Sequence, residues 1–203
     1  MPDKVDLYRQ DKRYYSAKRE PEQITVPPMA YLTISGKGAP EGDRFQSMLN
    51  AIYNAAYTVK FDSKAVGRDF KVTGLEGLWW GEERKGFLDV PREKWRFKLM
   101  IRVPDFITAA TLKHAKSKIA SKKDVPYLDE VKFEIIDEGL CVQVLHIGPY
   151  AEEEATVEKL HLFAGENGLA PVGHHHEIYL SDPRRVAPER LRTILRQPVR
   201  RKR

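Results

Sequence analysis

The chain of 203 residues carries 35 Lys and Arg against 29 Asp and Glu, a formal net charge of +6 at pH 7, and 41% of its residues are hydrophobic. That hydrophobic fraction is too high for a disordered chain, and no apolar run approaches the roughly 20 residues that span a bilayer. The charged N-terminus lacks the apolar segment of a secretory signal, and the single cysteine, Cys141, cannot form an intramolecular disulfide. We therefore expect a globular cytoplasmic protein without membrane insertion.

The first 20 residues are polar and charged, with Tyr8, Tyr14 and Tyr15 as their main apolar side chains. Because no apolar period runs through them, we expect residues 1–20 to form an N-terminal arm that becomes ordered by contact with the rest of the protein. The arm is too short to hold a helix-turn-helix domain, which argues against a self-contained transcription factor.

The chain that follows predicts a strand, a helix and two strands. Residues 24–36 are rich in β-branched and aromatic side chains and end at Gly36. A helix comes next, because apolar residues recur there at the spacing of one helix face, at Phe45, Met48, Leu49, Ile52, Tyr53 and Ala56. Residues 75–80 and 95–103 read as strands on either side of a charged loop over 81–91, and Thr108 can cap a further helix that runs to about residue 121.

The same order of elements returns in the second half. Residues 131–136 and 140–147 read as extended, a helix closes at Asn167-Gly168, and strands follow over 174–180 and 191–197. The helix opens with Glu152, Glu153 and Glu154, whose carboxylates suit the positive end of a helix dipole. Residues 30–36 can be laid over 142–148, and residues 99–104 over 193–198.

This repetition predicts an α+β fold made of duplicated β-α-β-β units, over about residues 24–104 and 131–199, inside a single domain of residues 21–199. In each unit the helix covers one face of an antiparallel sheet. Two units related by a pseudo-twofold axis would carry their helices on the outer face and form a concave groove between them. Concave surfaces at such junctions commonly bind ligands.

The C-terminal segment is strongly basic. Nine cationic residues lie there against Glu189 alone: Arg184, Arg185, Arg190, Arg192, Arg196, Arg200, Arg201, Lys202 and Arg203. Terminal charge runs are usually solvated, so we expect residues 200–203 to form a basic tail and expect no nucleic-acid partner. A contact with nucleic acid or an acidic protein through this basic surface is kept as a third functional hypothesis.

The strand over residues 174–180 contains the main candidate for chemistry. If Ile178 and Leu180 face the helices, strand alternation places His175, Glu177 and Tyr179 on the opposite side. A partly desolvated carboxylate at Glu177 would attract an organic cation, or would have the raised pKa that a general acid or base requires.

Four segments then resemble the GyrI-like small-molecule-binding family: LEGLWW at 75–80, IGPY at 147–150, EIYLSDPRR at 177–185 and LRTILRQPV at 191–199. The resemblance implies the duplicated fold of effector-binding domains of multidrug-sensing regulators such as BmrR. Those domains hold lipophilic cations against aromatic rings and a buried glutamate, which the motif matches to Glu177. Some stand-alone members are associated with hydrolysis of cyclopropane-containing alkylating natural products through a glutamate with tryptophan or tyrosine partners.

Aromatic partners for Glu177 come from the two tryptophans at 79 and 80, only one of which can enter the groove. The duplication pairs Trp79 with Tyr179, whereas a shift of one residue selects Trp80 together with Glu76, and two core tryptophans are a third possibility. Further candidate lining residues, for each of which core packing is the alternative, are Tyr150, Tyr31, Met100 and Ile194.

No cofactor motif is evident. The three consecutive histidines at 174–176 cannot all face one ion from a strand, so we expect no metal site. The sequence thus predicts binding of lipophilic, often cationic aromatic molecules at Glu177 and Tyr179. The alternative is a hydrolase that opens electrophilic cyclopropanes with the same two residues.

Overall fold

The computed structural model describes residues 4–81 and 90–202. The first half contains α1 (Leu7–Gln10), β1 (Glu22–Val26), β2 (Met29–Lys37), α2 (Asp43–Ala65), β3 (Glu76–Trp80), β4 (Arg96–Arg102) and α3 (Ala109–Ala120). The second half contains β5 (Lys132–Ile136), β6 (Gly139–Ile147), α4 (Glu154–Glu166), β7 (Leu169–Pro171), β8 (His175–Tyr179) and β9 (Arg192–Arg201). Most of the loop expected over 81–91 lies outside the described residues.

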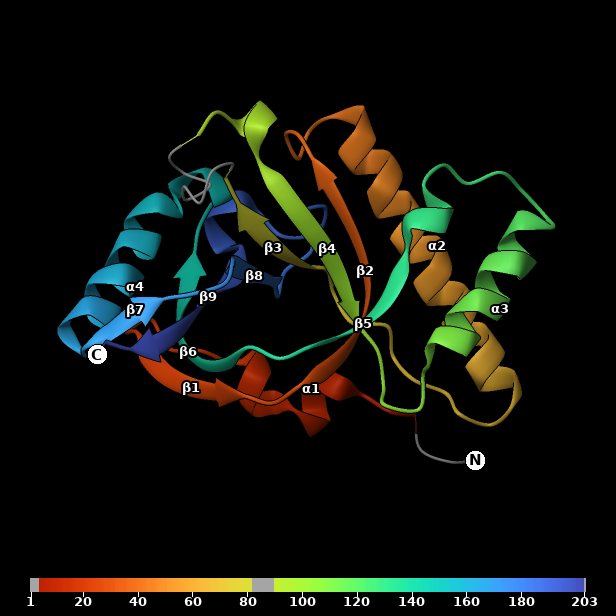
Figure 1. The fold of residues 1–203 in the computed structure, drawn as a ribbon, viewed down its shortest axis with the longest axis horizontal. Helices are drawn as coiled ribbons and strands as arrows, with labels where there is room; N and C mark the ends of the chain where they lie inside the picture. Colours follow the sequence, from red (N-terminus) through yellow and green to blue (C-terminus); the bar gives the residue numbers. More distant parts are fainter. Residues whose placement is uncertain (1–3, 82–89, 203) are drawn as a thin grey trace.

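The strands form a curled antiparallel sheet in the order β1-β6-β9-β8-β3-β4-β2-β5, with β7 paired to β9 (Figure 1). Exchanging each strand for its counterpart in the other half, β1 for β5, β2 for β6, β3 for β8 and β4 for β9, gives the same order in reverse. The predicted duplication and α+β class are therefore present as a pseudo-twofold arrangement. The two halves meet where β3 pairs with β8.

The two halves also exchange their first strands. β1 of the first half pairs with β6 of the second, and β5 of the second half pairs with β2 of the first. The sequence prediction joined β1 and β2 into one extended segment over 24–36, but Pro27-Pro28 separates them. Proline cannot donate a ladder hydrogen bond, so the chain can leave one edge of the sheet there and enter the other.

Helices α2 and α4 lie over opposite flanks of the sheet (Figure 1). The larger core cluster joins α2 and α3 to β2, β3 and β4, and includes Leu32, Ile52, Phe97 and Leu99, each at 1% exposure or less. A smaller cluster joins α4 to β6 and β9 through Val144, Leu160 and Leu195. Thr108 caps α3 as expected, since its side chain accepts a hydrogen bond from the Thr111 amide.

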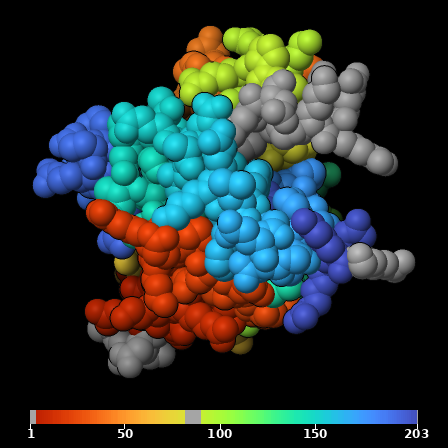
Figure 2. All heavy atoms as spheres, turned by 90° about the vertical axis from the view of Figure 1, so that its left-hand side faces the viewer, coloured from red at the N-terminus to blue at the C-terminus, as the bar shows by residue number. Residues whose placement is uncertain are grey.

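The other face of the sheet is covered by the N-terminal arm. Tyr15 packs there on Ile178 and Ile194, with Tyr8 and Tyr14 beside it. Space-filling Figure 2 shows this segment, in red and orange, lying against the light-blue atoms of α4, where Lys159 pairs with Glu20 at 2.7 Å. Both faces of the central strands are therefore buried.

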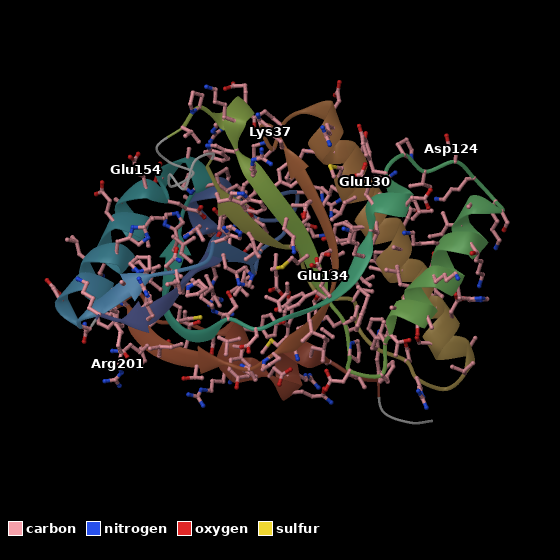
Figure 3. All side chains as sticks on the ribbon, viewed as in Figure 1. Lys37, Asp124, Glu130, Glu134, Glu154 and Arg201 are labelled. Atoms are coloured by element: carbon pink, nitrogen blue, oxygen red, sulfur yellow. The ribbon has the colours of Figure 1, made fainter. Side chains whose placement is uncertain are left out.

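The basic C-terminal segment is more ordered than the expected tail. β9 continues through Arg200 and Arg201 because β7 pairs with it there, and Arg201 projects from the end of β9 (Figure 3). Arg196 is removed from the basic surface altogether, since it is 1% exposed. Within residues 4–81 and 90–202, no helix is long and apolar enough to cross a membrane.

Candidate functional site

The candidate site lies at the junction of the two halves, where β3 and β8 pair. Gly77 is opposite Glu177, and Trp79 is opposite His175. Directly opposed residues of an antiparallel pair project to the same face of the sheet. Trp79 belongs to the core cluster that contains the α2 residues, so Glu177 also projects to the face that carries the helices.

This orientation corrects the sequence prediction for the strand. Ile178 and Leu180 were expected to face the helices, but they pack with Tyr15 of the N-terminal arm. The predicted alternation of side chains is present, but the two faces are the reverse of those predicted. The reason is that the N-terminal arm forms a second apolar layer, which the prediction did not include. Glu177 and Tyr179 therefore lie between the flanks occupied by α2 and α4.

A chain of hydrogen bonds joins three of the predicted residues. The indole Nε1 of Trp79 donates to the Tyr179 hydroxyl at 3.1 Å, and that hydroxyl donates to Glu177 Oε2 at 2.7 Å. This contact makes Trp79, and not Trp80, the tryptophan beside Glu177, although the residue opposite Trp79 in the ladder is His175. The Trp79 indole N–H orients the Tyr179 hydroxyl, and this hydroxyl in turn orients the Glu177 carboxylate.

An aromatic wall surrounds this chain. The Tyr150 ring packs edge-on against Tyr179, with 5.5 Å between ring centroids, and Phe45 of α2 stacks on Trp79 at 6.1 Å. Tyr150 is 38% exposed, whereas Glu177 is 6% exposed. The aromatic wall therefore reaches the surface at Tyr150 while the carboxylate stays inside.

A second carboxylate, which the sequence analysis did not single out, lies next to Glu177. Glu153 precedes α4 and is 7% exposed, although the Glu152 to Glu154 run was expected to interact with the helix dipole. A signal for its burial was available, because residue 153 begins the series Glu153, Val157, Leu160 and Ala164 that forms the buried stripe of α4. We call Trp79, Tyr150, Glu153, Glu177 and Tyr179 the Glu177 cluster.

Burial controls the protonation of both acids. Loss of solvation raises the pKa of Glu177 to about 7, against the lowering effects of the Tyr179 hydrogen bond and of the positive charge on His176. Burial and then the negative charge of Glu177 raise the pKa of Glu153 to about 9. Since the two acids interact, their protons belong to the pair. Between about pH 7 and pH 9 the pair therefore holds about one proton.

Two neighbouring groups stay uncharged. Burial, followed by the Glu177 charge, raises the pKa of Tyr179 well above its usual range, so its hydroxyl remains a donor. Burial lowers the pKa of His175 to about 3, so its imidazole, with Nε2 at 3.8 Å from Glu177 Oε1, is neutral. Among the described residues, no Lys or Arg forms an ion pair with Glu153 or Glu177.

The remaining candidates lie on the opposite face of the sheet, apart from Glu177. Glu76 is 1% exposed and accepts hydrogen bonds from the hydroxyls of Tyr15 and Tyr31, both at 3.2 Å, and it contacts His176 Nε2 at 3.0 Å. Met100 and Ile194 are fully buried in the clusters of that face. Glu76, Tyr31, Met100 and Ile194 thus belong to a packed interior beneath the N-terminal arm.

The same interior contains a complete ion network. His176 Nδ1 lies 3.0 Å from Glu138, which Arg196 also contacts at 3.2 Å, and the Arg196 guanidinium donates to the Tyr14 carbonyl at 2.6 Å. The pKa of Glu138 falls to about 2, because the charges and hydrogen bonds of His176 and Arg196 outweigh burial. This network is satisfied internally and covered by the arm.

Trp80, the alternative to Trp79, stacks on the exposed ring of His174 with 4.1 Å between centroids. The three histidines at 174–176 therefore diverge, since His175 and His176 project to opposite faces of the sheet. Among the described residues, no group of three or more His, Cys, Asp or Glu side chains is placed to hold a metal ion.

Two solved structures from Listeria innocua are similar over nearly the whole chain. An uncharacterized conserved protein is 40% identical, with TM-score 0.91, and a hydrolase is 39% identical, with TM-score 0.85. Each similarity covers 97% of this chain and 100% of the other. The C-terminal domain of EcmrR shares the fold at 16% identity and TM-score 0.59, over 90% of this chain and 98% of that domain. No curated protein matches the chain.

The family model for the GyrI-like small molecule binding domain matches residues 19–200. The matched region includes every member of the Glu177 cluster and both halves of the duplicated sheet. The chain belongs to the GyrI-like family of small-molecule-binding domains.

Proposed function

We propose that this protein binds lipophilic aromatic cations at the Glu177 cluster. The observation that supports this proposal is the buried pair of Glu153 and Glu177, to which no described Lys or Arg supplies a countercharge. An uncompensated buried carboxylate is costly, and a protein usually avoids the cost by taking up a proton. A bound organic cation would replace that proton.

The aromatic wall supports the same ligand class. Faces of Tyr and Trp attract cations by about 0.5 to 2 kcal/mol each, with the larger values at sites removed from water. Tyr150 is exposed and packs on Tyr179, whose hydroxyl contacts both Glu177 and the buried indole of Trp79. An aromatic cation could thus enter past Tyr150 and place its charge next to Glu177.

Titration of the protein with lipophilic cationic dyes, followed by tryptophan fluorescence, tests the proposal. Binding should weaken at least about tenfold in Glu177→Gln, because one charge-assisted contact at a buried site is lost. Glu158→Gln removes an exposed carboxylate of α4 and serves as the matched control. Equal affinity of Glu177→Gln and the unaltered protein for every dye would refute the proposal.

Hydrolysis is a second candidate function, supported by the raised pKa of Glu177 and by the 39% identity to a hydrolase from Listeria innocua. In a strained cyclopropane conjugated to a carbonyl, water would attack a ring carbon while Glu177 accepts the water proton. The ring carbon–carbon bond would break, and its electron pair would move to the carbonyl oxygen. Tyr179 could stabilise this oxygen by hydrogen bonding once the protonated Glu177 releases its hydroxyl. The oxygen would finally take up a proton.

Mass spectrometry distinguishes the two functions. A hydrolase should convert such a cyclopropane to a product heavier by one water, and Glu177→Ala should abolish this conversion while the thermal unfolding transition remains. A cyclopropane that binds the unaltered protein but is recovered unchanged would leave binding as the function.

A further inference from the structure

Glu153 differs from every other acid near α4 in being buried without satisfying its hydrogen-bonding capacity. It is 7% exposed, and among the described residues its Oε1 has no hydrogen-bond partner. The adjacent Glu154 is exposed and lies at the start of α4 (Figure 3). A buried carboxylate oxygen without a donor is uncommon in folded proteins and calls for an explanation.

The protein offers few donors to the two acids. The hydroxyl of Thr193 lowers the pKa of Glu153 by hydrogen bonding. Glu177 is another acid, and the Tyr179 hydroxyl already donates to Glu177 Oε2. Once a bound cation has displaced the proton that the pair holds, both carboxylates only accept hydrogen bonds. The hydroxyls of Thr193 and Tyr179 can donate just one hydrogen bond each to the four carboxylate oxygens, so further N–H or O–H donors must come from elsewhere. A ligand that carries such donors on its cationic group would supply both the countercharge and the hydrogen bonds that the two acids lack.

This requirement separates two kinds of organic cation. A quaternary ammonium ion offers charge and apolar surface but no N–H group, so carboxylate oxygens of the pair would stay without donors beneath it. A protonated amine offers the same charge together with one to three N–H donors. Leaving a buried acceptor without its donor costs enough to outweigh the gain in apolar contact from a methyl group.

We propose that Glu153 and Glu177 together bind the cationic head of the ligand through N–H donors, which makes protonated aromatic amines the preferred ligands of this protein over quaternary cations. This inference rests on the proposed function and narrows it. Glu177 supplies the attraction for charge, and Glu153 distinguishes ions by their N–H groups. The aromatic wall accommodates the ring of either kind of ion.

A series of naphthylmethyl ammonium ions tests this preference at pH 7.5. The primary ammonium, dimethylammonium and trimethylammonium ions share one ring and one charge and offer three, one and zero N–H donors. Calorimetry should show affinity falling along the series, by at least about tenfold from the primary to the trimethyl ion. Cation–π contact and apolar burial alone would leave affinity level or increase it with methylation.

Variants of Glu153 assign the preference to that residue. In Glu153→Met, which lacks an acceptor, the difference between the primary and trimethyl ions should shrink to about threefold or less, through loss of affinity for the primary ion. Glu153→Gln keeps the shape of the side chain and should give an intermediate ratio, and it replaces the methionine variant if that one does not fold. Glu154→Gln, at the exposed neighbour, should leave the ratio unchanged.

Two results would overturn the inference while the proposed function stands. One is equal binding of all three ions by the unaltered protein with loss of affinity in Glu177→Gln. The other is an unchanged preference for the primary ion in both Glu153 variants. If no ion binds with any dependence on Glu177, the proposed function fails, and the inference fails with it.

Discussion

Glu177 titrates in the range where binding is ordinarily measured, because burial raises its pKa to about 7. A bound cation favours the ionised carboxylates, so the affinity for a cationic dye should rise as the pH increases from about 5.5 and should continue to rise until the pH passes the Glu153 pKa of about 9. Fluorescence titration at several pH values measures this. The titratable groups around Glu177 are Glu153, Tyr150, Tyr179, His175 and, on the far face, His176.

An uncharged dye of similar size is the control, and its affinity should not change over the same pH range. A cationic dye whose affinity is equally flat would show that no carboxylate of raised pKa contacts its charge.

Gly77 permits the contact between Trp79 and Tyr179. A Cβ at position 77 would lie 2.8 Å from Trp79 Nε1 and 3.4 Å from the Tyr179 hydroxyl, so Gly77→Ala must displace the indole. We expect this variant to lose about 1 to 3 kcal/mol of stability and to bind cationic dyes more weakly. Urea denaturation and dye titration measure the two effects.

Gly165→Ala is the matched control, since a Cβ there meets no atom within 4 Å. Alanine in the last turn of α4 should stabilise the protein by less than about 1 kcal/mol and leave binding unchanged. Unaltered dye binding in Gly77→Ala would contradict a role for the Trp79 to Tyr179 hydrogen bond.

The two buried acids also make stability depend on pH. Their pKa values are raised in the folded protein, so the folded state holds protons that the unfolded chain releases above about pH 4.5, and stability must fall as the pH rises toward the folded pKa values. Glu153→Gln removes the part of this pH-dependent loss of stability that comes from Glu153. At pH 8.5 it should be more stable than the unaltered protein by about 1 to 2 kcal/mol, and at pH 4.5 the difference should disappear.

Thermal melts at both pH values measure the difference, with Glu154→Gln as the exposed control. A destabilised Glu153→Gln at pH 8.5 would show that the Glu153 carboxylate stabilises the fold, which is the opposite of the expected sign.

Among the elements, the N-terminal arm depends on the ion network beneath it. Arg196 contacts Glu138 at 3.2 Å and donates to the Tyr14 carbonyl at 2.6 Å. Arg196→Met should cost about 3 to 5 kcal/mol, because it leaves Glu138 with His176 as its one charged partner and removes a contact to the arm. Arg200→Met, on the exposed part of the same strand, should change the free energy of unfolding by less than about 0.5 kcal/mol in urea.

The sequence predicted the elements better than it predicted their faces. The apolar period from Phe45 onward indicates α2, which buries a stripe of regular spacing. The alternation through Phe97, Leu99 and Ile101 indicates β4, although the second half of this strand is buried on both faces. In β8 four consecutive residues from His175 to Ile178 are buried, so polarity could not show which face meets the helices. The N-terminal arm, whose position depends on contacts distant in sequence, decides that question.

The sequence predicted the residues of the site that lie on strands, and it missed the one that depends on how a helix packs. Trp79 and Tyr179 follow from the duplication, since pseudo-symmetric positions meet at the β3 to β8 pair. Glu153 reaches the site from the start of α4, and no alignment of the two halves identifies it. Its burial could be read from the α4 stripe, but its proximity to Glu177 depends on how the helix packs across the sheet.

At the scale of the whole molecule, the exchange of first strands makes the halves depend on each other. Fragment 1–123 would lose β5 from its sheet and would expose β1, and fragment 124–203 would lose β1. We expect the two fragments, coexpressed with a tag on one, to copurify in equal amounts and to melt in one transition. The break falls in the loop marked by Asp124 in Figure 3.

Each fragment expressed alone should show no cooperative thermal transition. A fragment that melts cooperatively by itself would show that its half folds without the exchanged strand.

The exchanged strands also limit how a ligand can enter. A two-lobed binding protein usually opens and closes around its ligand by rotation of the two lobes about a hinge. Here β1 pairs with the second half and β5 pairs with the first. Separating the halves at the junction of β3 and β8 would therefore also break the β1–β6 and β2–β5 ladders at opposite edges of the sheet. A ligand of the proposed site would therefore enter by rotation of side chains such as Tyr150, on a timescale far shorter than that of lobe separation.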